Sequence, residues 1–285
     1  MKIIDSHIHL FNLTQGDYHW LKKDNPPFWP DKHLIANNVN ESDLVLIPPL
    51  TLEGFVHIEA GYNNQEPWQE IAWLEQSCHL PFRSIANIDI TLPAIAFVHQ
   101  LKRILTHTSV VGFRHILDEN AFELLSSKQV QQNFSRLNQE QLIFEVQMPF
   151  SDSQAVNALS RVIANNSNIR FIINHAGIPP TKTHDFSVES PWYLGLAAIA
   201  TFENVAIKCS GWEMFDRHYN TQWSLAIIKQ CLALFGSRRV MISSNFPLSL
   251  FHCNYHEYWQ NMVKLATSLP NELFYNNSKY WYKFT

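Results

Sequence analysis

The sequence feature that most constrains the fold is a regular alternation of short apolar segments with amphipathic helical patterns. Eight segments rich in β-branched and aromatic residues are spaced through the 285-residue chain. They cover residues 1–10, 54–60, 82–90, 109–116, 141–148, 169–176, 204–210 and 239–245. Between them, apolar residues recur at helical spacing, as from Ala94 to Leu105 and from Leu225 to Phe235. Strands separated by helices predict a parallel sheet with right-handed crossovers.

Eight such repeats predict an α/β fold, a distorted (β/α)8 or TIM barrel, which typically needs about 250 residues. The alternative is a doubly wound open sheet, whose strands would be apolar throughout because both faces are buried. The segments here instead become polar at their C-terminal ends. No linker or shift in composition divides the chain, so we predict one domain over residues 1–285.

Composition narrows the class of function. Hydrophobic residues make up 46% of the chain and the net charge is -4 without a basic run, which argues against disorder and against nucleic-acid or membrane-surface binding. The four cysteines lack metal-site spacing, and Asp5, His7 and His9 interrupt the apolar N-terminal stretch, unlike in a signal peptide. We expect a soluble cytoplasmic protein that acts on a small molecule, and no pattern in the sequence specifies an oligomeric state.

The opening segment, MKIIDSHIHL, carries two histidines on one face. Successive side chains of a strand point to opposite sides, so His7 and His9 project together. Two imidazoles at the end of an apolar strand indicate a metal ion or a substrate oxygen that needs two donors. The alternative is a pair of ordinary surface histidines, since the chain has 14 of them.

The later segments add polar residues where each predicted strand ends. In a barrel these ends meet at one mouth, where active sites lie. The residues are His57, Glu59, Arg114, His115, Glu145, Gln147, His175, Lys208 and Asn245. We expect His57 and Glu59 to face the interior, with Val56, Ile58 and Ala60 opposite. Because each unsatisfied buried polar group costs about 1–3 kcal/mol, the set predicts a site. For single members, such as Lys208, a structural ion pair or hydrogen bond is the alternative.

Two stretches between the strands are candidates for covering that mouth. The first, residues 12–49, is rich in tryptophan and broken by prolines, which predicts a packed excursion over one end of the fold. The second is residues 212–222. Trp20, Trp29, Trp212 and Phe215 would either line a substrate pocket or belong to the core.

Seven segments in order carry a resemblance to a known family. They read IDSHIHLF at 4–11, YHWL at 18–21, FVHIEAGYNNQEPWQEIAWL at 55–74, VVGFRHIL at 110–117, FIINHAGIP at 171–179, VAIKCSGW at 205–212 and RVMISSNFPL at 239–248. The chain resembles amidohydrolase family 2 of the amidohydrolase superfamily, particularly its sugar-lactonase and dicarboxylate-lactonase branch. The resemblance implies a distorted (β/α)8 barrel that hydrolyses a lactone or related carbonyl compound, in some members with a divalent metal and in others without.

The resemblance also implies roles for individual residues. His7, His9 and His175 would be catalytic and would hold the metal, with zinc favoured by three nitrogen ligands. Arg114 and His115 would bind substrate, since a guanidinium suits the carboxylate of a sugar acid or muconate-type lactone. Alternatively, Arg114 has a carboxylate partner within the barrel. We add Glu59, Gln147 and Trp212 as expected substrate contacts.

The chain departs from the family pattern at strand eight. There the family reads Gly-Ser-Asp-Trp/Phe-Pro, whereas this chain reads Ser243-Ser-Asn-Phe-Pro247. The aspartate is the group expected to take a proton from the attacking water, and the carboxamide of Asn245 cannot do so near neutral pH. Either another base, such as Glu59, Glu145 or a histidine, replaces it, or a metal-bound water needs little help, or the barrel only binds.

The first hypothesis is therefore a hydrolase that opens a lactone of a sugar acid or dicarboxylic acid, with His7, His9, His175 and Asn245 at its catalytic centre. The second is a metal-dependent decarboxylase or hydratase of the same superfamily. The third is a catalytically silent barrel that binds a small organic acid.

Overall fold

The computed structural model describes residues 1–181 and 187–285 and contains eight parallel strands around a common axis. The strands are β1 (Lys2–Ile8), β2 (Thr51–Ile58), β3 (Phe82–Asn87), β4 (Val110–Arg114), β5 (Ile143–Val146), β6 (Arg170–Ile173), β7 (Val205–Cys209) and β8 (Val240–Ile242). They follow one another in sequence order, and each pairs in parallel with the next. The predicted (β/α)8 barrel is confirmed.

The barrel closes between β8 and β1 just beyond their regular ends. The backbone N–H of Asn245 donates to the carbonyl of His7 at 2.9 Å, and the N–H of His9 donates to the carbonyl of Phe246 at 2.7 Å. A parallel bridge between Ile8 and Phe246 lies beside them. The closure therefore brings the histidine pair and Asn245 to the same edge of the barrel.

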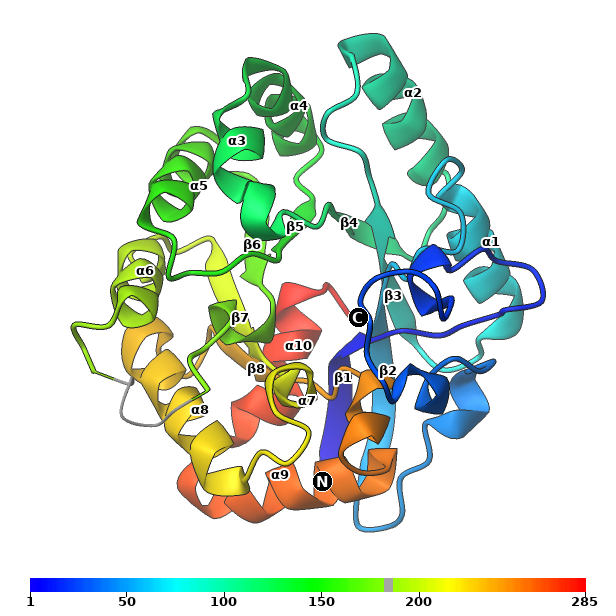
Figure 1. The fold of residues 1–285 in the computed structure, drawn as a ribbon, viewed down its shortest axis with the longest axis vertical. Coiled ribbons are helices and arrows are strands. Elements are labelled where there is room, and N and C mark those ends of the chain that lie inside the picture. The colour runs from blue at the N-terminus through cyan, green and yellow to red at the C-terminus, as the bar shows by residue number, and fades with distance from the viewer. Residues whose placement is uncertain (182–186) are drawn as a thin grey trace.

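Helices surround the strands, as Figure 1 shows. They are α1 (Trp68–Ser77), α2 (Ala94–Ile104), α3 (Ala121–Ser126), α4 (Lys128–Gln139), α5 (Ser153–Asn165), α6 (Pro191–Ala200), α8 (Thr221–Phe235) and α9 (Tyr255–Lys264), with the short α7 (Trp212–Phe215) and α10 (Asn276–Trp281). Side-chain caps stabilise several starts: Asp152 accepts from two N–H groups of α5, and Ser190 precedes Pro191 at the start of α6. No helix in the described ranges is both long and apolar enough to cross a membrane.

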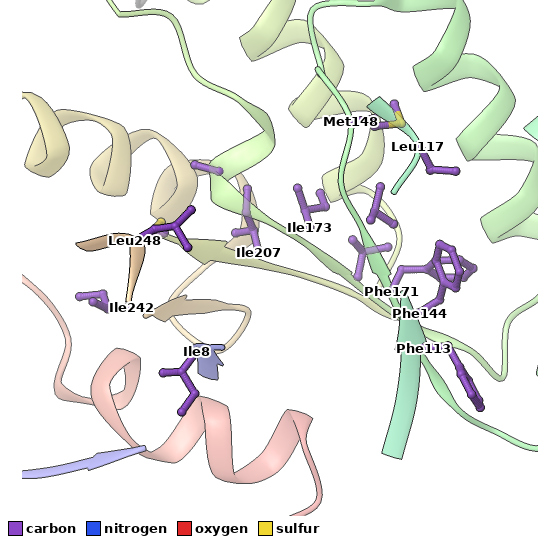
Figure 2. Packing of buried hydrophobic residues seen from close by; sticks show 14 of the residues in the cluster. Ile8, Phe113, Leu117, Phe144, Met148, Phe171, Ile173, Ile207, Ile242 and Leu248 are labelled. Carbon is purple, nitrogen blue, oxygen red and sulfur yellow. The ribbon is translucent and has the colours of Figure 1, made fainter. Parts of the chain in front are cut away.

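Most of the hydrophobic core lies between the strands and this outer layer. Apolar residues of successive strands point outward into it, and Figure 2 shows Ile8, Phe113, Phe144, Phe171 and Ile207 among them. Side chains of this kind alternate with inward-facing ones, as the pleat of a strand requires. The outer core accounts for the apolar positions that the helical spacing predicted on α2 and α8, including Phe97, Leu101 and Ile228.

The barrel interior is filled by a second, smaller apolar cluster. It consists of Val56, Ile58, Ile85, Val111, Ile143, Ile172, Ala206, Met241, Trp281 and Tyr282. The last two come from the C-terminal segment and plug one end of the barrel. Polar side chains of the site therefore rest on an apolar floor.

The prediction of which β2 side chains face the barrel interior was wrong for His57. Val56 and Ile58 belong to the interior cluster, and His57 points outward, where its Nε2 lies 3.1 Å from the Glu70 carboxylate of α1. The physical reason is that β1 and β2 pair with register shifts, so alternation alone does not tell which parity faces inward. Glu59 follows the end of the strand and is free of this constraint.

The 12–49 excursion packs over the C-terminal ends of the strands, as predicted. It contains the 3₁₀ turns η1 (His19–Leu21), η2 (Lys32–Leu34) and η3 (Glu41–Asp43). The Trp20 indole donates to the carbonyl of Ala60, just after β2, at 2.8 Å. The buried Lys32 ammonium donates to the backbone carbonyls of Trp20, Lys22 and Asn25, which holds the excursion together.

Candidate active site

Three imidazoles meet at the C-terminal face of the barrel. The ring centroids of His7 and His9 lie 5.0 Å apart, and those of His7 and His175 lie 4.7 Å apart. Their exposed fractions are 0%, 6% and 3%. The structure thus brings together the strand-one pair and the strand-six histidine. His175, Ala176 and Gly177 adopt positive φ angles of 51°, 51° and 69°, and this tight turn follows β6 directly.

Hydrogen bonds assign the protons on two of these rings. The Ile58 carbonyl can only accept, so His9 donates to it from Nδ1 at 2.9 Å and keeps a lone pair on Nε2. The Lys208 ammonium donates to His7 Nδ1 at 2.7 Å, so the proton of neutral His7 is on Nε2. That proton points to His9 Nε2, 3.2 Å away. Burial, with the nearby Lys208 charge, lowers the pKa of His7 and His175 well below 6.5, and burial likewise lowers that of His9.

Beneath the imidazoles lies a buried ion pair. Lys208 donates to Glu145 Oε2 at 2.6 Å, and the Tyr282 hydroxyl donates to the other oxygen of Glu145. Burial lowers the pKa of Lys208 to about 8, although the Glu145 charge opposes this shift. Glu145 and Lys208 therefore form a structural ion pair, which is the alternative that the sequence left open. Lys208 also orients His7.

The backbone after β7 packs tightly on the third imidazole. The Ser210 hydroxyl lies 3.0 Å from His175 Nδ1, so this contact engages Nδ1 and not Nε2. A Cβ atom on Gly211 would lie 2.4 Å from the same Nδ1, and the φ of Gly211 is +73°. Only glycine suits both the close approach and this backbone conformation.

Arg114 is held by other residues of the barrel mouth. Its Nε donates to Glu59 Oε1 at 2.8 Å, its Nη2 to the Glu59 carbonyl at 2.9 Å, and its Nη1 to Gln147 Oε1 at 3.1 Å. The carboxylate partner that the sequence offered as an alternative is thus Glu59. Burial raises the pKa of Glu59, and the Arg114 charge opposes this shift. His115 lies apart from this group, with Nδ1 3.2 Å from the carbonyl of Ile88.

Asn245 has an acidic partner that sequence reasoning missed. Its Nδ2 donates to Glu213 Oε1 at 2.6 Å, and Glu213 is fully buried. Within the described ranges, neither Asn245 Oδ1 nor Glu213 Oε2 has a hydrogen-bond partner. Burial raises the pKa of Glu213 to about 7. The available signal was position: Glu213 follows the end of β7 by four residues, where other strand ends carry polar groups.

The turn that carries Asn245 is anchored from below by Asp5. This buried carboxylate accepts from both the backbone N–H and the hydroxyl of Ser244. Burial raises the pKa of Asp5 to about 6 despite these hydrogen bonds. Asn245 itself has a φ of 59°, in the left-handed region that asparagine tolerates better than most residues.

Comparison with known proteins identifies the family. A sequence profile described as Amidohydrolase matches residues 4–284. The chain belongs to the amidohydrolase family. Membership supports an enzyme, a hydrolase or a related activity.

Individual relatives of this amidohydrolase are distant. It is 23% identical to uncharacterized protein y4mH of Sinorhizobium fredii over 302 residues, which cover 99% of this chain and 98% of that protein. A zinc-bound amidohydrolase from Burkholderia multivorans superposes with a TM-score of 0.80 at 19% identity, covering all of both chains. A putative 2-pyrone-4,6-dicarboxylic acid hydrolase from Pseudomonas putida gives a TM-score of 0.72 at 14% identity, covering 99% and 97% of the two chains. At such identities the structural likeness shows a shared fold.

The donor set of this amidohydrolase does not fit the metal that the family implies. A ligating histidine presents a lone pair to the ion and donates its other N–H to a carbonyl or carboxylate. His9 meets this condition through Ile58, whereas the ammonium at Nδ1 of His7 puts the proton on the Nε2 that would face a metal. Among the residues that the structure describes, no three His, Cys, Asp or Glu side chains form a group that could hold a metal ion.

Trp212, which was predicted to contact substrate, directly precedes Glu213 in the sequence, and its side chain is fully buried. Its indole packs edge-to-face on Trp223 with centroids 5.5 Å apart and belongs to the main core cluster. Its Nε1 has no hydrogen-bond partner in the part of the chain that is described. In this conformation Trp212 is a core residue, which is the alternative that the sequence also allowed.

Proposed function

We propose that this amidohydrolase opens a lactone of a sugar acid or dicarboxylic acid by water attack at the C-terminal face of its barrel. The observation that carries the proposal is the meeting of three neutral imidazoles, those of His7, His9 and His175, in a site almost closed to solvent. Attack on a lactone carbonyl puts negative charge on its oxygen. Preorganised N–H donors in a water-excluded site stabilise that charge strongly.

The proton positions favour specific roles for these rings. His7 Nε2 carries a proton because Lys208 holds Nδ1, so His7 donates to the carbonyl oxygen of the substrate. His175, positioned by Ser210 and Gly211, provides a second donor when the Ser210 hydroxyl donates to its Nδ1. In the absence of substrate, His9 Nε2 accepts a hydrogen bond from His7 Nε2–H, which keeps the two rings aligned.

A carboxylate on the substrate is supported by the charge of the mouth. Arg114 is held by Glu59 and Gln147, and one of the two N–H groups on its Nη1 donates to Gln147. The remaining N–H is available to a substrate carboxylate. The similarity in fold to a protein named as a putative dicarboxylic acid hydrolase supports the same substrate class.

The test is a hydrolysis screen with the purified protein. We expect ring opening of carboxylated lactones, such as 2-pyrone-4,6-dicarboxylate and sugar-acid lactones, measured by proton release. His7→Asn and His175→Asn should each lower kcat/KM by about 10²–10³, the usual effect of removing one oxyanion donor. His99→Asn, an exposed histidine on α2, is the matched control and should leave the rate unchanged.

Elemental analysis of the same preparation, and assays with added zinc, address the metal that the family implies. Absence of ring opening in every condition would refute the proposal. Carbon dioxide release from an aromatic or unsaturated acid would assign the barrel to decarboxylation instead, and thermal stabilisation by acids without turnover would indicate a binding protein.

A further inference from the structure

The proposed hydrolysis needs a group that accepts a proton from the attacking water. By the family resemblance this group would be an aspartate at position 245, where the chain has an amide. The amide of Asn245 donates to the carboxylate of Glu213 at 2.6 Å. A carboxylate therefore lies one hydrogen bond away from the expected place.

We propose that Glu213 is the general base of this site and that Asn245 holds its carboxylate in position. This inference rests on the proposed lactone hydrolysis. It assigns to a residue of the loop after β7 the proton transfer that the resemblance assigns to strand eight.

Packing connects Glu213 to the imidazoles on both sides. The loop that carries it begins at Ser210 and Gly211, which contact His175 directly. Its side chain contacts Asn245, whose backbone N–H donates to the carbonyl of His7. The carboxylate is thus tied to the ends of β6 and β1, which carry His175 and the His7–His9 pair.

Each partner of this hydrogen-bonded pair has one acceptor oxygen left. Glu213 Oε2 and Asn245 Oδ1 are buried, and neither accepts a hydrogen bond from the described residues. Buried acceptors are nearly always satisfied, and a water molecule has two O–H donors to offer. One water can donate to the amide oxygen, which orients it, and to the carboxylate, which takes its proton.

The other acids of the mouth and barrel are already engaged. Glu59 is bound by Arg114, and both oxygens of Glu145 accept, from Lys208 and Tyr282. Both oxygens of Asp5 accept from Ser244. Among these four carboxylates, Glu213 is the one with a fully buried oxygen that has no hydrogen-bond partner in the described residues.

The surroundings of Glu213 hold its pKa in the range that suits a general base. The titratable groups facing it are Arg217, Tyr219, Cys253 and Tyr258. Burial raises the pKa of the two tyrosines and of the thiol, so these three are neutral near pH 7, whereas Arg217 is charged. Burial raises the pKa of Glu213 itself to about 7, close to the value at which a base is both ionised and basic.

In the proposed reaction, water adds to the lactone carbonyl and the ring then opens. An O–H bond of water breaks and its proton goes to Glu213 Oε2, while the water oxygen bonds to the lactone carbonyl carbon. The carbonyl π electrons move to its oxygen, which accepts hydrogen bonds from the imidazoles. When the carbonyl re-forms, the ring C–O bond breaks, and the leaving alkoxide takes the proton back from Glu213. The product is the open hydroxy acid.

The test is the pH dependence of kcat for the lactone that wild type opens. Wild type should show an ascending limb near pH 7, because the carboxylate form is active. Glu213→Gln should lose the limb and about 10²–10⁴ of the rate. Glu213→Ala should be partly rescued by added formate, which a merely structural role would not produce. Glu140→Gln, an exposed glutamate on the surface, is the control.

The outcomes separate the two proposals. If wild type opens lactones while Glu213→Gln keeps the rate and the limb, Glu213 is not the base and the proposed function stands. If wild type opens none, both proposals fall. Should Glu213→Gln not fold, Glu213→Asp decides: retained activity with a displaced limb supports the base, and an unmoved limb overturns it.

Discussion

Two fully buried glutamates, Glu145 inside the barrel and Glu213 at its mouth, differ in how their oxygens are satisfied. Glu145 accepts from the Lys208 ammonium with one oxygen and from the Tyr282 hydroxyl with the other. Glu213 accepts from the Asn245 amide with one oxygen, and its other oxygen has no partner within the described ranges. A completely paired carboxylate stabilises the architecture, whereas a half-paired one costs stability and keeps the capacity to react.

The difference follows from where the two residues stand. Glu145 lies on β5 between hydrogen-bonded neighbours, above the apolar floor that includes Tyr282. Glu213 lies on the short α7, beyond the last paired residue of β7. Strands hold a side chain in a fixed direction, while the loops after them vary freely and carry chemistry.

Breaking the inner pair should give the largest effect. Glu145→Gln leaves the Lys208 ammonium buried without its counter-charge, so we expect a loss of about 3–5 kcal/mol in the free energy of unfolding. Urea denaturation at pH 7 measures it, with Glu140→Gln as the exposed control. A loss below about 1 kcal/mol would mean that Glu145 is not needed to balance a charge, and the contrast with Glu213 would disappear.

Glu213→Gln should instead raise the free energy of unfolding relative to wild type, and only at higher pH. Burial raises the pKa of Glu213 from 4.5 to about 7, so the folded state binds this proton more tightly than the unfolded chain. The resulting stability is complete below pH 4.5 and is lost as pH rises to about 7. Glutamine does not titrate, so the variant should gain up to about 3 kcal/mol over wild type at pH 8.

The measurement is the difference in unfolding free energy between Glu213→Gln and wild type at pH 5 and pH 8. A difference that grows over this interval sharpens the comparison with Glu145. Equal differences at both pH values would show that the Glu213 carboxylate is solvated or paired in solution.

The smallest effect concerns the cover of the mouth. Arg217, four residues after Glu213, pairs with Asp31 of the 12–49 excursion at 2.8 Å, with side-chain exposures of 22% and 25%. Because such a pair is partly solvated, Asp31→Asn should cost about 0.5 kcal/mol, and less at high salt. Thermal unfolding in low and high salt tests this, and a loss of several kcal/mol would mean that the excursion controls the stability of the Glu213 region.

Sequence patterns predicted the fold and part of the site, but not every contact between residues far apart in the sequence. The fold and the meeting of His7, His9 and His175 were predictable because parallel strands force their C-terminal ends to one rim. The direction of His57 was predicted wrongly, since irregular register between β1 and β2 decides which parity faces inward. Glu213 was missed because the four-residue α7 is too short to show helical periodicity, which leaves only its position after a strand end as a signal.

The sequence by itself determined the barrel, through strand and helix periodicity, and the polar mouth, through residue types at strand ends. Only the tertiary structure decided the partners: Arg114 with Glu59, Lys208 with His7, and Asn245 with Glu213. The physical reason is distance. Periodicity places a side chain on a face, but a hydrogen bond depends on atoms within about 3 Å, which register, loop conformation and packing across the whole chain set together.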